Sequence, residues 1–326
     1  MRIAVLGAGA WGSALAVSFS ATHEVCLWAR RREACEEISR RRASPYLPEV
    51  GFPGSLRIEA DLVAAISASD LAIVATSTAG LRETSAAVAA IRARLDLLWA
   101  CKGFETGTGL LPHQVLAQTM PRSLRIGALS GPSFALEVAR GQPTALTIAS
   151  LDEGFAASTA AALNGPRLRI YSSADQVGVE LGGALKNVIA IAAGISDGLE
   201  LGRNARAALV TRGLAEIARL GVAMGGQPET FMGLTGLGDL VLTATGDLSR
   251  NREVGLRLAQ GRTLDSILAD LGHVAEGVNS ARAAQALAAR HGVEMPITEA
   301  VCAVLFEGLS PRVAVQRLLA RDPRTE

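Results

Sequence analysis

The sequence predicts an α/β fold in two domains: a doubly wound parallel sheet in residues 1–174, followed by an all-helical domain in residues 175–326. Up to about Ser173, short β-rich apolar runs alternate with alanine-rich helical segments, the pattern of a parallel sheet with helices on both faces. After that point strand-like runs disappear, and segments rich in Ala, Leu, Gly and Arg continue to the end. A chain of 326 residues is long enough for two domains with a core each.

A glycine-rich turn joins the first predicted strand to the first predicted helix. The apolar run from Ile3 to Leu6 is followed by Gly7, Gly9 and Gly12, and helix-prone residues continue to Phe19. At this spacing the first glycine permits a tight turn, the second lets the backbone approach a pyrophosphate, and the third allows close helix–strand packing. The N–H groups at the helix start then hold the phosphates. The first domain is therefore predicted to be a Rossmann-type dinucleotide-binding domain.

The second predicted strand, residues 24–28, ends without the acidic residue that usually binds the ribose hydroxyls of NAD. Arg30, Arg31 and Arg32 follow it instead. Guanidinium groups at this place accommodate a 2′-phosphate, which favours NADP(H) as the preferred cofactor, with NAD(H) possible. The alternative is that these arginines only begin a solvated surface helix.

Four further strands are predicted at residues 71–75, 96–101, 124–130 and 144–149, with helices at 80–92 and 111–118 between them. Ligands of doubly wound sheets bind at the carboxyl ends of the strands. Three features lie at such ends: Thr76 to Thr78, the turn around Lys102, and the segment from Ser130 to Ala135. The last of these has a proline at a helix start and free amide groups for an anion, although a routine strand–helix turn explains it equally well.

Composition excludes several classes of function. The net charge of +1 lacks the basic excess of a nucleic-acid binder, and the four cysteines and four histidines are too scattered for a metal site or a nucleophilic catalytic set. The uncharged run 3–22 superficially resembles a signal peptide, but its glycines fall at turn spacing. We expect a soluble cytoplasmic protein with buried reduced thiols, no integral membrane association, and a homodimeric state, as is usual for soluble enzymes.

Lysine is almost absent from this chain. Of the 32 basic residues only Lys102 and Lys186 are lysine, so an amine is expected to be needed at these two positions. An ammonium can transfer a proton when burial lowers its pKa, whereas a guanidinium stays protonated. On the helix around Lys186, Gly182 and Gly183 allow close approach of a backbone or a ligand, and Asn187 borders the same cleft.

Two later segments carry polar groups in unusual surroundings. Asp239 follows an apolar, glycine-rich run, where an unpaired charge is costly, so we expect it to face a cation or a solvated cleft; a helix cap is the alternative. Ser249, Arg250, Asn251 and Arg252 group hydroxyl, guanidinium and amide donors that suit a phosphate, unless the arginines are merely solvated.

The ordered set of motifs resembles the bacterial NAD(P)-dependent glycerol-3-phosphate dehydrogenases. It comprises GAGAWGSALA, LWARR, CKGFE, SGPSFA, LGGALKNVIAI, DGLELGRNARAALVTRGLAE, GLTGLGDLVLT, SRNR, EG and GVEMPIT, and it spans residues 2 to about 318. ALKN, and GLGDLVLT with SRNR, are specific to that family rather than to Rossmann proteins in general.

The resemblance implies hydride transfer from a reduced nicotinamide to dihydroxyacetone phosphate, giving sn-glycerol 3-phosphate for phospholipid synthesis. It implies Lys186 as the catalytic acid/base and Asp239 as its acidic partner. The substrate-binding positions are Lys102, Gly131, Ser133, Lys186, Asn187, Asp239, Ser249, Arg250 and Asn251. The cofactor-binding positions are Gly7, Gly9, Ala10, Trp11, Gly12, Arg30, Arg31, Lys102, Ala135, Arg250, Val274 and Glu276.

The sequence departs from the family pattern in two places, and two other classes of protein share part of that pattern. The family often has a proline near the end of the strand at 71–75, where this chain has Thr76-Ser77-Thr78, and the glycine usual before HEV is missing. Another two-domain 2-keto or 3-hydroxy-acid reductase shares the glycine turn and a helix-borne lysine, but does not need SRNR and SGPS as a phosphate cradle. A catalytically silent NADP-sensing protein would have lost Lys186 or Asp239, and both are present.

Overall fold

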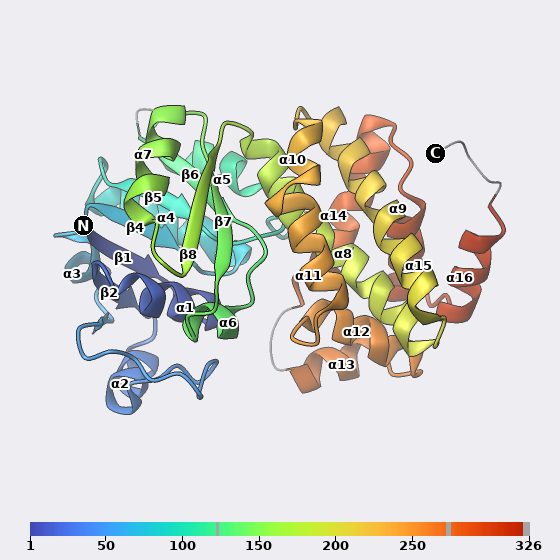
Figure 1. The fold of residues 1–326 in the computed structure, drawn as a ribbon, viewed down its shortest axis with the longest axis horizontal. Helices are drawn as coiled ribbons and strands as arrows, with labels where there is room; N and C mark the ends of the chain where they lie inside the picture. The colour runs from blue at the N-terminus through green and yellow to red at the C-terminus, as the bar shows by residue number, and fades with distance from the viewer. Residues whose placement is uncertain (122–123, 272–274, 322–326) are drawn as a thin grey trace. The chain divides into compact units, whose positions relative to one another are not determined.

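The computed structural model describes residues 1–121, 124–271 and 275–321, and the chain forms two compact units, Met1–Gln176 and Val177–Glu326 (Figure 1). The first unit is α/β. In the second unit every described element is helical. The predicted fold class, a Rossmann-type sheet domain followed by an all-helical domain, is confirmed.

An eight-stranded sheet forms the centre of the first unit, with the order β3-β2-β1-β4-β5-β6-β7-β8. Neighbouring strands are parallel except for β6 and β7. The order reverses direction between β1 and β4, which is where a doubly wound sheet binds its ligand. The strands are β1 Arg2–Leu6, β2 Glu24–Trp28, β3 Arg57–Glu59, β4 Leu71–Val74, β5 Asp96–Trp99, β6 Ile126–Ser130, β7 Thr144–Ala149 and β8 Leu168–Ser173.

Seven helices connect these strands. Helix α1 is the one that follows the glycine turn, and α4 packs against both β4 and α5. Their bounds are α1 Ala10–Phe19, α2 Arg32–Arg41, α3 Leu62–Ile66, α4 Thr78–Ile91, α5 Pro112–Thr119, α6 Ala135–Ala139 and α7 Glu153–Leu163.

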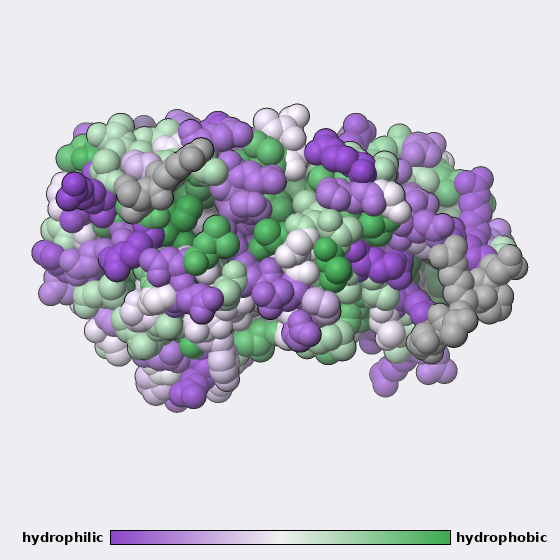
Figure 2. Space-filling view, turned by 90° about the horizontal axis from the view of Figure 1, so that it is seen from above, coloured by the Kyte–Doolittle hydropathy of each residue, from purple (hydrophilic) through white to green (hydrophobic). Residues whose placement is uncertain are grey.

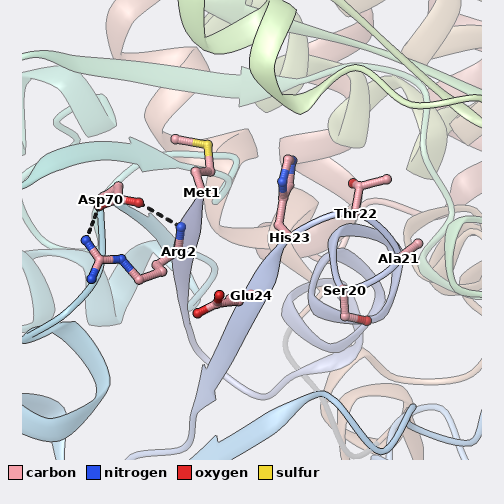
Figure 3. A pocket seen from close by; sticks show the side chains of 8 residues that line it. All are labelled: Met1, Arg2, Ser20, Ala21, Thr22, His23, Glu24 and Asp70. Carbon is pink, nitrogen blue, oxygen red and sulfur yellow. Dashed lines mark hydrogen bonds and ion pairs between the residues drawn. The ribbon is translucent and has the colours of Figure 1, made fainter.

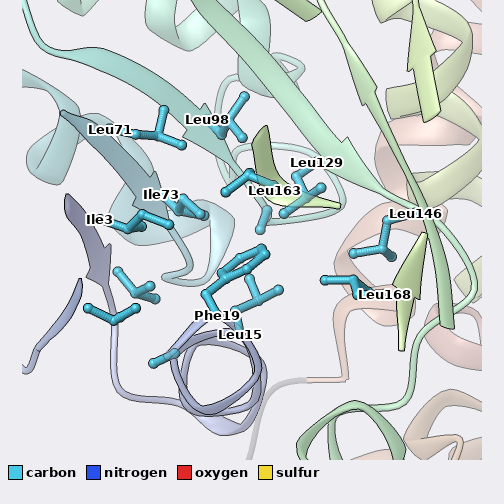
Figure 4. Packing of buried hydrophobic residues seen from close by; sticks show 14 of the residues in the cluster. Ile3, Leu15, Phe19, Leu71, Ile73, Leu98, Leu129, Leu146, Leu163 and Leu168 are labelled. Atoms are coloured by element: carbon cyan, nitrogen blue, oxygen red, sulfur yellow. The ribbon is translucent and has the colours of Figure 1, made fainter. Parts of the chain in front are cut away.

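The apolar strands are buried because helices cover the sheet. Leu15 and Phe19 of α1 pack with Ile3, Ile73 and Leu163 in one fully buried cluster (Figure 4). Each such Leu, Ile or Phe contributes roughly 1.5–3 kcal/mol when it leaves water. This core fixes the carboxyl ends of β1 and β4 beside the start of α1.

The sheet differs from the sequence prediction in three places. Strands β3 and β8 were not predicted, because β3 has only three residues and β8 alternates buried and exposed positions with charged and polar residues. The β6–β7 pair is antiparallel, so the sheet is not wholly parallel. The chain returns from β6 through the short helix α6, which packs on α1, and therefore makes no full crossover.

The second unit consists of helices around the buried helix α8. They are α8 Gln176–Gly198, α9 Gly202–Ala223, α10 Pro228–Met232, the π-helical turn η1 Leu234–Gly238, α11 Asp239–Thr245, α12 Arg250–Ala259, α13 Leu264–Leu271, α14 Glu276–His291, α15 Pro296–Phe306 and α16 Pro311–Leu319. Helix α8 is long and apolar enough to cross a membrane, but its apolar window is entirely buried inside the protein, as in a core helix.

Glycines let α12 cross α8 at very short range. A Cβ on Gly194 would lie 1.9 Å from the carbonyl oxygen of Arg252, and a Cβ on Gly255 would lie 1.9 Å from that of Ile191. Neither contact is possible for a larger residue, so this crossing depends on glycine at both positions. On the surface visible in Figure 2, hydrophilic and hydrophobic residues are interspersed.

Candidate active site

Lys186 and Asp239 form a buried ion pair in the helical unit. Lys186 lies in the middle of α8 and is 7% exposed, while Asp239 begins α11 and is fully buried. The ammonium Nζ donates a hydrogen bond to Asp239 Oδ1. Asp239 therefore faces a cation, as expected from the sequence, and neither a solvated cleft nor a capping role explains it. A pair this deeply buried is retained only where its charges are compensated, which makes it a candidate for chemistry.

The backbone before Asp239 explains why this carboxylate reaches α8. Residues 234–238 form a π-helical turn, a rare element that occurs mostly at functional sites. A Cβ on Gly182 would lie 2.4 Å from the carbonyl oxygen of Thr235, so only glycine lets this turn approach α8 so closely. Because Gly182 lies one helical turn before Lys186, the close approach brings Asp239 onto the lysine.

Thr243 completes this group and was not predicted. Lys186 Nζ donates to Thr243 Oγ1 at 2.9 Å, and that hydroxyl donates to the carbonyl oxygen of Asp239 at 2.7 Å. Its spacing in the sequence could have identified it, because Thr243 follows Asp239 by four residues and both therefore lie on one face of α11. The side chains of Asp239 and Thr243 together hold the lysine amine in a defined direction.

Asn187 and Asn251 join α8 to α12 next to the lysine. Asn251 Nδ2 donates to Asn187 Oδ1 at 2.9 Å, and Asn251 Oδ1 accepts from the backbone N–H of Gly277 at 3.0 Å. The Nδ2 atom of Asn187 is buried and has no hydrogen-bond partner within the described parts of the chain. A buried amide donor rarely stays unsatisfied, so this atom is a candidate ligand contact.

The start of α12 uses its polar residues in different ways. Ser249 is the N-cap, and its Oγ accepts from the N–H of Arg252. Arg250 is exposed. Arg252 was expected to belong to a group of phosphate donors, but its guanidinium bonds to Asp197 and Asp247 instead. Glu276 begins α14, directly before Gly277, while Val274 lies outside the described residues.

The glycine turn of the first unit has the shape that a dinucleotide requires. Gly7 has φ +123°, and a Cβ there would lie 2.8 Å from the backbone of Ala75. A Cβ on Gly12 would lie 1.9 Å from the carbonyl oxygen of Gly7, so the helix seats directly on the turn. A Cβ on Gly9, by contrast, would have no described atom within 4 Å. The turn is therefore packed at Gly7 and Gly12 and open at Gly9, where a pyrophosphate would approach.

The first turn of α1 and the start of α6 pack together. Ala10 and Trp11 lie against the same small cluster as Ala135, which begins α6. Among the described residues, no side chain caps the N-terminus of α1. The structure thus brings together three of the positions predicted for the cofactor, beside N–H groups that suit an anion.

Lys102 lies with Gly131 and Ser133 at the carboxyl ends of β5 and β6. Lys102 Nζ donates to the carbonyl oxygen of Gly131 at 3.0 Å, and Ser133 Oγ donates to the same oxygen at 3.1 Å. Thr78 Oγ1 donates to the carbonyl oxygen of Lys102 at 3.0 Å. The three features predicted at strand ends therefore meet at one edge of the sheet.

The arginines after β2 lie at the surface. Arg30 is paired with Glu83 of α4 at 3.2 Å, and both side chains are largely exposed. Arg31 is also exposed, and Arg32 begins the amphipathic helix α2. An exposed pair of this kind contributes about 0–1 kcal/mol, so Arg30 can exchange its partner for a phosphate at little cost.

A hollow of about 520 Å³ opens at the other end of the strands, lined by Met1, Arg2, His23 and Asp70 among others (Figure 3). Arg2 and Asp70 already pair with each other there. Because β1, β2 and β4 start at this edge, the hollow lies away from the carboxyl ends where such sheets bind ligands. We do not assign it to the site.

A glycine turn that is open at Gly9 and a buried amine–carboxylate pair in one chain fit a nucleotide-dependent oxidoreductase. The family models for the N-terminus and the C-terminus of NAD-dependent glycerol-3-phosphate dehydrogenase match residues 2–156 and 175–316, and the chain belongs to this family.

Full-length relatives agree with the family models. The "Glycerol-3-phosphate dehydrogenase [NAD(P)+]" of Aromatoleum aromaticum is 57% identical, with 100% of each chain covered. The crystal structure of glycerol-3-phosphate dehydrogenase from Coxiella burnetii is 40% identical, with a TM-score of 0.93 over 98% of this chain and 99% of that one. A probable 2-dehydropantoate 2-reductase from Bacillus subtilis, at 15% identity, TM-score 0.56 and 94% and 99% coverage, shares the fold alone.

Proposed function

We propose that this protein reduces dihydroxyacetone phosphate to sn-glycerol 3-phosphate with NAD(P)H, reversibly, and so supplies glycerophospholipid synthesis. The observation that carries the proposal is the buried Lys186 amine, directed by Asp239 and Thr243, in a chain that also has an open dinucleotide cradle at Gly9. A carbonyl reduction needs both a nucleotide site and a proton donor beside the carbonyl oxygen.

In this proposal Lys186 is the catalytic acid. As the carbonyl carbon accepts hydride, negative charge develops on the C2 oxygen, and the ammonium stabilises that charge and donates the proton. Asp239 and Thr243 fix the direction of Nζ. General acid catalysis of this kind contributes roughly a hundredfold to ten-thousandfold in rate.

The substrate contacts are assigned to residues that the sequence singles out as hydrogen-bond donors. We assign the phosphate and hydroxyl contacts to Lys102, Gly131, Ser133, Asn187, Ser249, Arg250 and Asn251. The buried Nδ2 of Asn187 supports this assignment, because a substrate oxygen would satisfy it.

The cofactor is assigned to residues 1–174 as the NAD(P)-binding domain, and the acid/base chemistry to residues 175–326. A bound reduced nicotinamide supplies the hydride. The residues assigned to hold it are Gly7, Gly9, Ala10, Trp11, Gly12, Arg30, Arg31, Lys102, Ala135, Arg250, Val274 and Glu276. Because Arg30 and Arg31 offer two exposed guanidiniums after β2, we propose NADP(H) as the preferred form. We also propose a cytoplasmic homodimer.

The direct test follows NADPH oxidation at 340 nm with dihydroxyacetone phosphate, and with NADH in parallel. The Lys186→Met variant should lose roughly a hundredfold to ten-thousandfold in kcat, as expected for a catalytic acid. Removing one partner of a buried pair can unfold a protein, so the double variant Lys186→Met with Asp239→Leu serves as the second, apolar test.

Each outcome separates the proposal from its rivals. Turnover that needs the substrate phosphate and collapses in both folded variants supports it. Faster reduction of a non-phosphorylated keto acid would mean that the keto acid, and not dihydroxyacetone phosphate, is the substrate. NADPH binding without turnover of any carbonyl would indicate a sensor.

A further inference from the structure

The last residue of the SRNR segment, Arg252, contacts two carboxylates rather than pointing into a phosphate cradle. Its Nε lies 2.8 Å and its Nη2 2.7 Å from Asp197 Oδ2, near the end of α8. Its Nη1 lies 3.1 Å from Asp247 Oδ1, just before α12. The two main partners, Arg252 and Asp197, are each only 16% exposed, so this pair is much less solvated than the surface ion pairs.

Asp197 receives a second guanidinium from α9. Arg206 Nη1 lies 3.0 Å from Asp197 Oδ2 and 3.2 Å from Asp197 Oδ1. One carboxylate at the end of α8 therefore links the start of α9 and the start of α12. A network of charge-assisted hydrogen bonds fixes direction as well as distance, because the guanidinium fork is planar and rigid.

The glycine crossing brings the backbones of α8 and α12 together, and two side-chain pairs, Asn187–Asn251 and Asp197–Arg252, link the same two helices. Gly194 and Gly198 on α8 and Gly255 on α12 let the backbones touch. A contact between smooth backbone surfaces limits the separation of two helices, but interlocking side chains are what resist sliding and rotation. The Asp197–Arg252 pair is located at this crossing, and Arg252 directly follows Asn251 in the sequence.

We propose that Asp197, through Arg252, is a positioning residue that sets the first turn of α12 and thereby the donors Ser249, Arg250 and Asn251. The inference rests on the proposed function, in which those three residues hold the substrate phosphate. Asp197 itself touches no substrate. Its loss weakens the grip on the phosphate and leaves Lys186, held by Asp239 and Thr243, in place.

The test compares Asp197→Asn and Arg252→Gln with Arg257→Gln as the matched control. Arg257 lies in the last turn of the same helix and pairs with Glu253 and Asp270. For the two network variants we expect KM for dihydroxyacetone phosphate to rise about tenfold with kcat within about threefold, because displacing a binding group costs affinity before chemistry. The control should keep both constants.

Two further measurements distinguish positioning from general loosening. The Kd for sn-glycerol 3-phosphate, measured by calorimetry, should rise in the same proportion as KM. The kcat/KM for dihydroxyacetone, which has no phosphate, should stay at the wild-type value.

Two further variants test the linkage itself. The double variant Asp197→Asn with Arg252→Gln should raise KM no more than either single variant does, since both substitutions remove one linkage. Arg252→Lys should restore little, because an ammonium cannot bridge two carboxylates as a fork does.

Three results would overturn the inference. Equal losses with phosphorylated and non-phosphorylated substrate would reduce the pair to a structural role. A raised KM in Arg252→Gln with a normal one in Asp197→Asn would mean that Arg252 binds the phosphate directly. Wild-type protein that does not turn over dihydroxyacetone phosphate would overturn the proposed function, and this inference with it.

Discussion

Glu216 is a carboxyl group that replaces a helix cap. It lies on α9, is 1% exposed, and accepts hydrogen bonds from the N–H groups of Ile297 and Thr298 and from the Thr298 hydroxyl. The N-cap residue of α15, Met295, has no side-chain acceptor, so Glu216 satisfies the first turn of that helix from outside. Burial nevertheless dominates and raises the pKa of Glu216 to about 7, because the three donors offset only part of the desolvation.

This pKa predicts a stability change between about pH 4.5 and pH 7. In that window the unfolded chain has released the proton from Glu216 while the folded chain retains it, so the folded state is favoured at the acid end. Stability should therefore fall as pH rises from about 4.5 to about 7, by on the order of 3 kcal/mol, since each pH unit between the two pKa values is worth about 1.4 kcal/mol.

The measurement compares urea unfolding of the wild-type protein and Glu216→Gln from pH 5 to pH 8. Other titrating groups cancel in the difference between the two. We expect the wild type to lose stability relative to the variant as pH rises. A constant difference across the range would mean that the carboxylate is ionised throughout.

The sequence singled out the residues of the candidate site whose chemistry is unusual for this chain. Lys102 and Lys186 stand out because almost every other cation is arginine, and Asp239 because it follows an apolar run. Thr243 was missed since a threonine on an apolar helix is not unusual in itself. Arg252 was grouped with phosphate donors because adjacency in sequence does not show direction: the side chain one residue after Asn251 points to Asp197.

At the scale of elements, the contact between α8 and η1 depends on a glycine, Gly182, at the point of closest approach. A methyl group on Gly182 would lie 2.4 Å from a backbone oxygen, and a backbone cannot yield as a flexible side chain can. We expect Gly182→Ala to push η1 away from α8, at a cost of about 1–3 kcal/mol in stability. The same shift separates Asp239 from Lys186, so kcat should fall at least about tenfold.

Gly154→Ala is the matched control for this prediction. Gly154 lies in the first turn of α7, where a methyl group would make an ordinary 3.4 Å contact with Asp152. Alanine there should be neutral or slightly stabilising, because it lowers the entropy of the unfolded chain. Normal kcat and stability in Gly182→Ala would show that η1 is not held by this contact.

Strands were predictable from the sequence where they are buried on both faces. The runs at β2 and β7 were placed at their observed bounds, and β4, β5 and β6 within two residues at each end, since continuous apolar residues mark a central parallel strand. The edge strands β3 and β8 carry charged and polar residues and give no such signal. The antiparallel direction of β7 depends on where α6 packs, which no local pattern specifies.

At the scale of the whole molecule, the change from strands to helices near residue 175 was readable because it alters the period of the apolar pattern along half the chain. The close contacts inside the helical unit were not readable in the same way. They depend on glycines at 182, 194 and 255, and a glycine in a helix looks the same in sequence whether it contacts a backbone or open solvent.

Cofactor preference is a property of the folded molecule that can be measured without turnover. A ligand that binds only the folded chain at a hundred times its Kd adds about 2.7 kcal/mol to the stability. For a domain of 150–250 residues, the size range of the first unit, each kcal/mol raises Tm by roughly 2–4 °C. If Arg30 and Arg31 hold a 2′-phosphate, NADPH should raise Tm several degrees more than the same concentration of NADH, with no substrate present.

Two double variants test this assignment. In Arg30→Ser with Arg31→Ser, NADPH and NADH should raise Tm equally. In Arg40→Ser with Arg41→Ser, at the far end of α2, NADPH should still raise Tm more than NADH does. If NADPH and NADH raise the Tm of the wild type equally, these arginines only begin a solvated surface helix and do not hold a 2′-phosphate.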